Sequence, residues 1–385
     1  MTLKAKKSLP LKDIALSLKA IEEVALKCKK CGKCQPECPV FRETGYENLT
    51  ARSKLSLISS IDKKLGILPS KVGKSLSICL LCGRCKSVCT QGIDTSALFL
   101  HARLLLDEFN KKSIFKKMII FIFMKLPFKS GKKYKSPEIQ TFSSFTNPLQ
   151  PKNKKIIFFS GCLFDKFFPD KTEKAKKILK SAGFDVDVIN GKCCGLPHLT
   201  SGNKDAFLKS ASSLANKISS LNADIIVSGC PTCTMTLKQL WPKFFDENFD
   251  FIKNLTVLDF HQLLAKTQIK TDKISNNKNI TWHNPCHFKS IGIKNEPEKL
   301  LHELLGYNFI KSSDICCGFG GSFSIDHPLI SHSMGKKKLD NMREDKSSIL
   351  ATGCPACIMQ LKKSSGFKIE VLHTIDIMYE ALIKE

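Results

Sequence analysis

The amino-acid sequence predicts an all-helical N-terminal domain followed by two copies of a small α/β unit. Three observations lead to this prediction. The eighteen cysteines of the 385-residue chain fall into a few tight groups with none left over. Apolar residues around the first groups recur near the helical period of 3.6 residues. Corresponding cysteines in the second half lie 123 or 124 residues apart, which indicates a duplicated unit.

The composition is that of a globular protein and argues against several classes. Hydrophobic residues make up 42% and charged residues 25% of the chain. The first thirty residues lack a signal-type apolar stretch, so we expect metal-binding thiols in a reducing, cytoplasmic compartment rather than structural disulfides. The formal net charge of +26 comes from lysines spread along the chain, which disfavours nucleic-acid binding. The longest apolar run, residues 118–124, is too short to span a membrane.

Two cysteine motifs of identical spacing, Cys-x2-Cys-x2-Cys-x3-Cys, occur within the first ninety residues. This is the spacing of the bacterial two-cluster ferredoxins, in which the fourth cysteine of each motif binds the other cluster. On that pattern one [4Fe–4S] cluster has the ligands Cys28, Cys31, Cys34 and Cys89. The second has the ligands Cys79, Cys82, Cys85 and Cys38. Paired zinc sites are the alternative, although tetrahedral zinc has no use for the third cysteine of each triplet. Thr90 stands where proline is usual, which should matter little because it is not a ligand.

The amino-acid sequence around these motifs predicts helices rather than β-hairpins. Amphipathic patterns cover residues 11–25, 50–61 and 97–109. The forty residues between Cys38 and Cys79 are too many for a compact β-hairpin ferredoxin. We therefore expect an α-helical ferredoxin domain with two [4Fe–4S] clusters over residues 1–110.

A connector is expected over residues 111–152. Six lysines surround its apolar run, and a stretch rich in Ser, Thr and Pro follows. One interpretation places residues 111–135 on an anionic membrane surface. The other, which we favour, packs the Phe and Ile side chains of this segment on the rest of the protein.

The second half contains two groups of five cysteines, and the sequences between the cysteines are similar in the two groups. We assign the first unit to residues 153–268 and the second to residues 277–385. Short strands are expected over 155–159, 184–188 and 224–227 in the first unit, and over 279–282, 307–310 and 348–351 in the second. Asp170 with Glu173 predicts a capping box at the start of a helix in the first unit, and Gly183 predicts its end. In the second unit the corresponding helix is expected to start at Asn295 and to end at Gly306. Such alternation predicts mainly parallel sheets with every cysteine near a strand's carboxyl end.

Five thiolates from separate loops would thus meet at one place in each unit. The adjacent pairs Cys193–Cys194 and Cys316–Cys317 are poor disulfide partners, and five sulfurs exceed the needs of one zinc ion. A multi-iron cluster can use them all. Buried free thiols and a disulfide relay are the alternatives.

The pattern Cys…Cys-Cys-Gly…Cys-x2-Cys resembles the cysteine-rich CCG domain of heterodisulfide reductases. Two copies behind a two-cluster ferredoxin are similar to the glycolate oxidase iron–sulfur subunit, to the corresponding subunit of anaerobic glycerol-3-phosphate dehydrogenase and to lactate-utilisation iron–sulfur proteins. The resemblance implies one or two non-cubane [4Fe–4S] clusters. The ligands of the first would be Cys162, Cys193, Cys194, Cys230 and Cys233. Those of the second would be Cys286, Cys316, Cys317, Cys354 and Cys357. His283, His287 and His198 lie near these cysteines and are expected to tune the clusters rather than bind iron.

No dinucleotide, phosphate-loop or flavin motif occurs, and no catalytic residue is assigned. The simplest interpretation is an oxidoreductase subunit that passes electrons from a partner FAD-dependent flavoprotein to a quinone or membrane acceptor. The resemblance implies glycolate or lactate as the partner's substrate. A subunit like that of glycerol-3-phosphate dehydrogenase, a disulfide-reducing catalytic subunit and a zinc-bearing interaction protein remain alternatives. The expected location is the cytoplasm or the inner face of its membrane.

Overall fold

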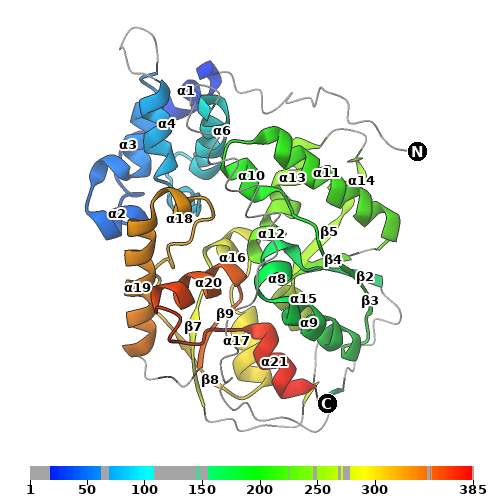
Figure 1. Cartoon of the computed structure of the whole chain (residues 1–385). Coiled ribbons are helices and arrows are strands. Elements are labelled where there is room, and N and C mark those ends of the chain that lie inside the picture. Colours follow the sequence, from blue (N-terminus) through cyan, green and yellow to red (C-terminus); the bar gives the residue numbers. More distant parts are fainter. Residues whose placement is uncertain are drawn as a thin grey trace.

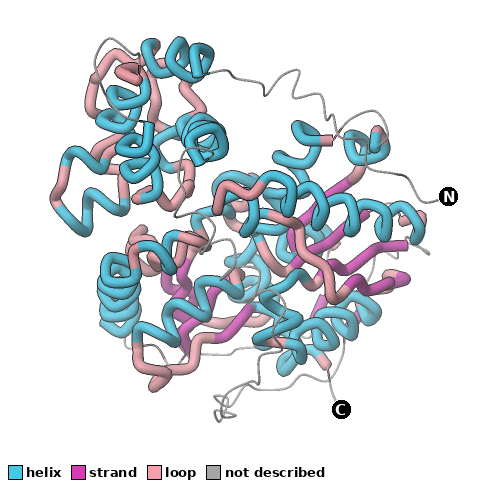
Figure 2. The backbone as a smooth tube through the Cα atoms, turned by 45° about the horizontal axis from the view of Figure 1, so that its top comes forward, coloured by secondary structure: helices cyan, strands magenta, loops and turns pink. Residues whose placement is uncertain are grey.

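The computed structural model describes residues 18–61, 69–107, 145–146, 155–223, 225–245, 249–267, 270–271, 278–344, 347 and 349–383. Figures 1 and 2 show a helical N-terminal body beside two α/β bodies that lie against each other. Most of the predicted connector, including the segment 111–135 considered for membrane contact, lies outside the described residues. No helix among the described residues is long and apolar enough to cross a membrane.

The N-terminal body consists of short helices around the eight cysteines of the two motifs. The helices are α1 (Leu18–Leu26), α2 (Pro39–Thr44), α3 (Ala51–Ile58), α4 (Pro69–Ser77), α5 (Arg84–Ser87) and α6 (Thr95–Asp107), with a 3-10 turn at Glu47–Leu49. Helix α3 begins where the apolar pattern predicted, and its N-cap Thr50 accepts a hydrogen bond from the Ser53 amide. Its apolar face, with Leu55 and Ile58, packs against Ile21 in a buried core.

The first α/β unit is a parallel four-stranded sheet of order β3-β2-β4-β5. Its strands are β2 (Lys155–Phe159), β3 (Asp185–Ile189), β4 (Ile225–Ser228) and β5 (Thr256–Asp259). Its helices are α8 (Gly161–Phe167), α9 (Pro169–Ser181), α10 (Leu196–Thr200), α11 (Lys204–Leu221), α12 (Pro231–Met235), α13 (Trp241–Phe244), α14 (Phe251–Asn254) and α15 (Phe260–Lys266), with a π-helical turn at Thr236–Leu240. Strands β2 and β4 are buried on both faces, which explains why their sequences are continuously apolar.

The second unit repeats this topology with the order β10-β9-β7-β8, again all parallel. Its strands are β7 (Asn279–His283), β8 (Asn308–Lys311), β9 (Ile349–Thr352) and β10 (Leu372–His373). Its helices are α16 (Cys286–Ile291), α17 (Glu296–Glu298), α18 (Phe323–Asp326), α19 (Pro328–Glu344), α20 (Pro355–Ser364) and α21 (Thr374–Leu382), with a π-helical turn at Lys299–Leu304. The sequence pattern predicts three strands per unit and does not reveal β5 and β10.

Two local predictions can be compared with the structure of α9. This helix begins at Pro169 with Phe168 as its N-cap and without a side-chain cap, so the capping box predicted at Asp170 is wrong. Proline at the first helical position supplies a preset φ angle and needs no amide partner there. The predicted helix stop at Gly183 is confirmed by its φ of +86°.

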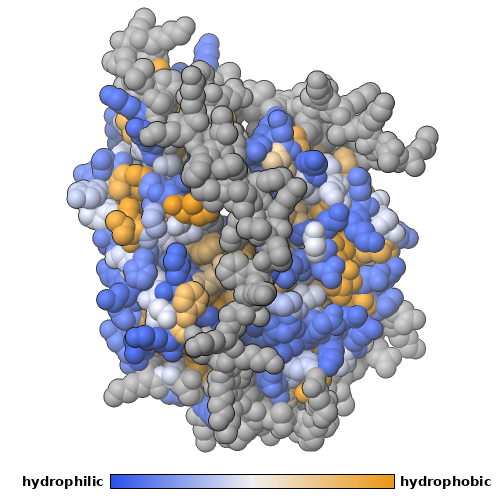
Figure 3. All heavy atoms as spheres, in the orientation of Figure 1, coloured by the Kyte–Doolittle hydropathy of each residue, from blue (hydrophilic) through white to orange (hydrophobic). Residues whose placement is uncertain are grey.

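The two units share one hydrophobic core in addition to the cluster that each buries by itself. Phe158 and Phe164 of the first unit belong to the same buried cluster as Trp282, Phe288 and Leu372 of the second. A buried ion pair reinforces this contact, because Lys171 Nζ of α9 lies 2.6 Å from Asp376 Oδ2 of α21. The units therefore form one packed body. Hydrophilic side chains cover most of the coloured surface on the face in Figure 3.

Polar contacts join the N-terminal body to the second unit. The guanidinium of Arg84 donates to both carboxylate oxygens of Asp314, at 2.7 and 2.6 Å, and also to Glu37. Nearby, Leu80 packs in a buried cluster with Phe323 of α18. These contacts hold α5, which carries Cys85, and the preceding loop with Cys82 against the second α/β unit.

Candidate metal centres

Two cavities in the N-terminal body divide the eight motif cysteines into two groups. The first cavity is lined by Cys28, Cys31, Cys34 and Cys89, and also by Cys85, which lines the second cavity as well. Cys31 is the exposed member; the structure buries the other seventeen cysteines wholly or in part. The amide of Lys33 and the hydroxyl of Thr90, 3.7 Å from the sulfur, lower the pKa of Cys31. Thr90 thus contacts this site, although its place in the motif indicates no role.

The second cavity is lined by Cys38, Cys79, Cys82 and Cys85. Burial raises the pKa of Cys38, Cys82 and Cys85, so these thiols would not readily ionise without a nearby positive charge. Each cavity also corresponds to one of the two ligand sets that the motif spacing predicts.

One buried and one half-buried cation lie beside the second cavity. The side chain of Lys54, on α3, is only 2% exposed and lines the cavity, and its ammonium donates to the Leu49 carbonyl. Burial lowers the pKa of Lys54, whereas the nearby thiolates of Cys79 and Cys38 favour its charged form. The guanidinium of Arg103, on α6, donates to the carbonyls of Leu76 and Cys79 at 2.6 and 2.5 Å. These positive charges suit an anionic group bound by four thiolates.

Sequence reasoning missed Lys54 and Arg103. The signal for Lys54 was present, because the residue lies three positions after Ala51 and four before Ile58 on the apolar face of α3. A lysine on the buried face of a helix needs an anionic or carbonyl partner.

In the first α/β unit the five cysteines converge from three loops at the carboxyl ends of β2, β3 and β4. Cys193 Sγ lies 3.8 Å from Cys162 Sγ, and Cys194 interacts with both Cys193 and Cys233. The backbone reaches this arrangement through Gly161, with a φ of +73°, where a Cβ would lie 3.0 Å from Cys233 Sγ. The structure thus brings together all the residues predicted here.

The protonation of these thiols is strongly coupled. Cys193 and Cys233 donate hydrogen bonds to neighbouring sulfurs, and this, together with burial, raises their pKa. The hydrogen bonds that Cys194 accepts from Cys193 and Cys233 lower its pKa. Five thiolates, four of them buried, cannot coexist this close together without compensating positive charge. Metal ions would supply that charge, so this donor set fits an iron cluster better than free thiols.

The second unit repeats the arrangement with Cys286, Cys316, Cys317, Cys354 and Cys357. Cys317 Sγ lies 3.3 Å from Cys357 Sγ, and the remaining cysteines interact electrostatically with these two. Burial and the neighbouring sulfurs raise the pKa of Cys286 to about 12. The same coupling of buried thiols therefore applies here.

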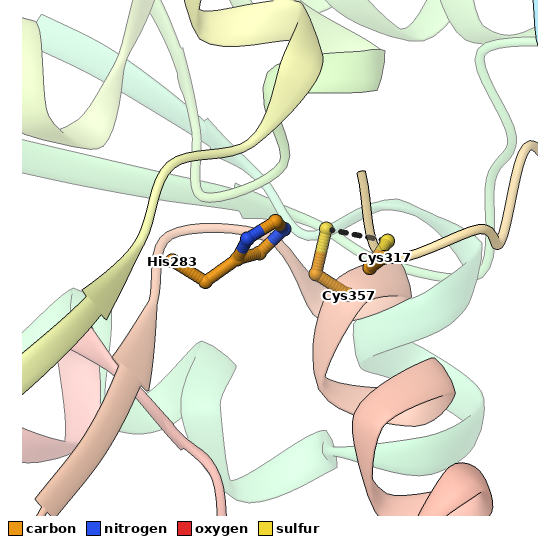
Figure 4. A group of neighbouring side chains, drawn as sticks. All are labelled: His283, Cys317 and Cys357. Atoms are coloured by element: carbon orange, nitrogen blue, oxygen red, sulfur yellow. Dashed lines mark hydrogen bonds between the residues drawn. The ribbon is translucent and has the colours of Figure 1, made fainter. Parts of the chain in front are cut away.

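His283 adds a nitrogen to the second five-cysteine site. Its ring at the end of β7 points toward Cys357 and Cys317 (Figure 4), and the three donor atoms lie within 4.8 Å of one another. Burial lowers the pKa of His283, and within the described part of the chain neither ring nitrogen has an oxygen or nitrogen partner. This ring can donate to, or bind, whatever the sulfurs hold. Lys338 is buried beside it, and burial lowers its pKa to about 8.

The other two predicted histidines also lie near cysteines. His287 Nδ1 lies 2.8 Å from the Thr232 hydroxyl, so it links the loop of Cys286 to the loop between Cys230 and Cys233. Burial lowers the pKa of His287 to about 4. His198 is buried next to Cys194 and its pKa is lowered by burial.

A cavity of about 1860 Å³ lies between the N-terminal body and the two units. Its walls include Cys82 from the N-terminal body, Cys162 and Cys194 from the first unit, and Cys286 and Cys316 from the second. The charge of Cys286 is the strongest electrostatic influence on the pKa of Cys82, after burial. Three of the four cysteine groups therefore meet at one cavity.

Two family models match the chain. The model of a 4Fe-4S dicluster domain matches residues 24–93, and the model of the cysteine-rich domain CCG matches residues 156–238 and again 280–362. These matches agree with the assignment made from the cysteine motifs, and they cover all eighteen cysteines.

Several curated proteins are similar over most of the chain. The probable glycolate oxidase iron-sulfur subunit of Bacillus subtilis is 24% identical, with 92% of this chain and 94% of the relative aligned. One subunit of the dihydromethanophenazine:CoB–CoM heterodisulfide reductase of Methanosarcina acetivorans is 24% identical over 92% of this chain and 93% of its own length. Lactate utilization protein A of Oceanobacillus iheyensis is 30% identical over 58% of this chain and 96% of its own length.

Proposed function

Because the chain belongs to the family of iron–sulfur proteins with cysteine-rich CCG domains, we propose that it is the electron-transfer subunit of a flavin-dependent 2-hydroxy-acid dehydrogenase. A partner flavoprotein would oxidise a glycolate- or lactate-type substrate, and electrons would leave this chain toward quinone. The names of the glycolate oxidase and lactate utilization relatives support this choice of substrate.

The proposal assigns all eighteen cysteines as iron ligands. Two cubane [4Fe–4S] clusters would be held by the two cavities of the N-terminal body, with the exchanged fourth ligands Cys89 and Cys38. A non-cubane cluster would be held by each group of five. The gathering of thiols at four places, with buried cations beside two of them, supports this assignment.

The observation that carries the proposal is the order of the cysteine groups in space. Electrons would enter at the first group, where Cys31 is exposed, and pass to the second group, which shares Cys85 with the first cavity. Cys82 of the second group interacts electrostatically with Cys286 and Cys316 of the second unit. The hydrogen bond between His287 and Thr232 then links the two five-cysteine sites.

Anaerobic purification with iron and sulfide counting tests the proposal. We expect about sixteen iron atoms per chain when all four sites are filled. The isolated chain should be reduced by dithionite but should not oxidise glycolate, lactate or glycerol 3-phosphate. A colourless chain that stays free of iron after reconstitution, or substrate turnover without a partner, would contradict it.

The route can be tested by substitution. In Cys82→Ser, freeze-quench electron paramagnetic resonance should show the first cluster reduced at the normal rate and the five-cysteine sites reduced more slowly. Cys354→Ser is the matched control, because it lies beyond Cys82 on the proposed route and should leave reduction of both cubane clusters unchanged. Equal reduction of the five-cysteine sites in Cys82→Ser would rule out this order.

A second candidate function is reduction of a disulfide at a five-cysteine site. The cavity of about 1860 Å³ favours it, since both five-cysteine sites open into this space, and a protein of a heterodisulfide reductase is among the relatives. The test is to offer small thiol–disulfide compounds to the dithionite-reduced chain and to measure thiol release. Failure to cleave any of them leaves the electron-transfer role.

A further inference from the structure

The last helix of each α/β unit begins against the cysteine loop of the other unit. At the start of α21, His373 Nε2 donates to the carbonyl oxygen of Gly229 at 3.0 Å, and both groups are buried. Gly229 directly precedes Cys230, so this hydrogen bond fixes the peptide plane that carries the Cys230 amide. His373 belongs to the second unit, whereas Cys230 belongs to the first.

The ring of His373 can act only as a neutral donor at this position. Its Nδ1 accepts the amide of Ile375 at 3.1 Å, which leaves the proton on Nε2. Burial, together with the nearby His261, lowers the pKa of His373 to about 3, so the ring stays neutral at pH 7. The packing around Gly229 is tight, because a Cβ on this residue would lie 2.6 Å from Phe164 and 2.9 Å from Ile375.

The first unit makes the reciprocal contact. His261 lies at the start of α15; its Nδ1 lies 2.6 Å from Asp259 Oδ1, and its Nε2 lies 2.8 Å from the hydroxyl of Thr374 in α21. A Cβ on Gly353 would lie 2.5 Å from His261 Cε1. Gly353 directly precedes Cys354, so the ring of the first unit packs against the last cysteine loop of the second.

We propose that His373 and His261 are positioning residues, each holding the Gly-Cys-Pro-x-Cys loop of the opposite unit. Neither five-cysteine site then keeps its geometry without the other unit. The identification of these sites as iron sites rests on the function proposed above, but the positioning itself concerns cysteines that the structure already brings together. Outer groups that orient metal ligands change metal affinity by about 10- to 100-fold.

The test uses the full chain and three histidine variants, two at the buried His373 and one at the exposed His302. His373→Leu removes the donor to Gly229, and His373→Gln keeps a side-chain N–H that can replace it. His302→Leu is the matched control: His302 Nδ1 also donates to a backbone carbonyl, that of Tyr307, at 2.7 Å, but within the second unit. Circular dichroism checks that each variant folds.

The first measurement is the alkylation rate of each cysteine in the iron-free chain, followed by mass spectrometry. His373→Leu should raise the rate at Cys230 several-fold and leave Cys354 unchanged, while His373→Gln should restore it. The second measurement is iron retention by the first-unit site in a Cys316→Ser/Cys317→Ser background, where His373→Leu should weaken retention by about tenfold or more. If His373→Leu does not fold, His261→Leu is measured instead, and it should raise the alkylation rate of Cys354.

Unchanged reactivity of Cys230 in folded His373→Leu, or an equal change at the cysteines of both units, would overturn the proposal. The same change in His302→Leu would indicate a general loss of packing and would also overturn it. A wild-type chain that binds no iron at the first unit defeats the proposed function, whereas the alkylation result still decides the positioning role.

Discussion

Replacing Lys54 with methionine removes a buried positive charge beside Cys38 and Cys79 while keeping most of the side-chain volume. The side chain is 2% exposed, so water screens its ammonium little. At a separation of about 6 Å and an effective dielectric constant of about 20, the lost attraction for one electron is about 3 kcal/mol. Since about 1.4 kcal/mol corresponds to 59 mV for a one-electron couple, the potential of the second cluster should fall by about 120 mV. The sign is negative because the reduced cluster carries the extra negative charge.

Redox titration followed by electron paramagnetic resonance measures this shift. Lys54→Arg keeps the charge and should move the potential little, and Lys33→Met removes an exposed lysine near the first cluster, where screening by water makes the effect small. A potential that stays within about 20 mV of wild type in folded Lys54→Met, or one that rises, would refute the electrostatic reasoning.

Two further predictions concern stability. The hydrogen bond and charge of Arg84 lower the pKa of Asp314. The pair therefore stabilises the fold above the unfolded-state pKa of about 3.9, and this stabilisation is lost as the pH falls through the lower folded-state pKa. When urea unfolding midpoints are measured between pH 5 and 2, the decrease of the midpoint with falling pH should be smaller in Asp314→Asn than in wild type, and an unchanged decrease would contradict this. In Gly195→Ala the new Cβ would lie 2.6 Å from Phe207 at a φ of +90°, so the free energy of unfolding should fall by more than about 2 kcal/mol. Gly45 is also at positive φ but has no atom within 4 Å of a new Cβ, so Gly45→Ala should lower the free energy of unfolding by only about 1 kcal/mol. Equal losses in the two variants would refute the steric argument.

The sequence predicted three strands of each unit and the cysteine loops because these features depend on the local amino-acid sequence. Buried parallel strands are continuous apolar runs, and β2 and β7 stand within one residue of their predicted ranges. Strand β10 has only two residues, too few for a recognisable pattern, and was missed. The capping box at Asp170 failed because Pro169 starts the helix one residue earlier.

Contacts between distant segments could not be predicted in the same way. No spacing rule relates His373 to Gly229, 144 residues earlier, or Arg84 to Asp314, 230 residues later. Such contacts result from the summed packing of many side chains across the shared core. The position of Cys82 beside the second unit is of the same kind.

By itself, the sequence determined that eighteen thiols occur in four groups, since the spacing of cysteines along the backbone limits which sulfurs can reach one another. The tertiary structure decided how these groups are arranged: one at the surface, three around a common cavity, and two units that hold each other's cysteine loops. The physical reason is that ligand spacing is a local property of the chain, whereas the relative placement of sites depends on long-range packing between bodies folded from separate stretches.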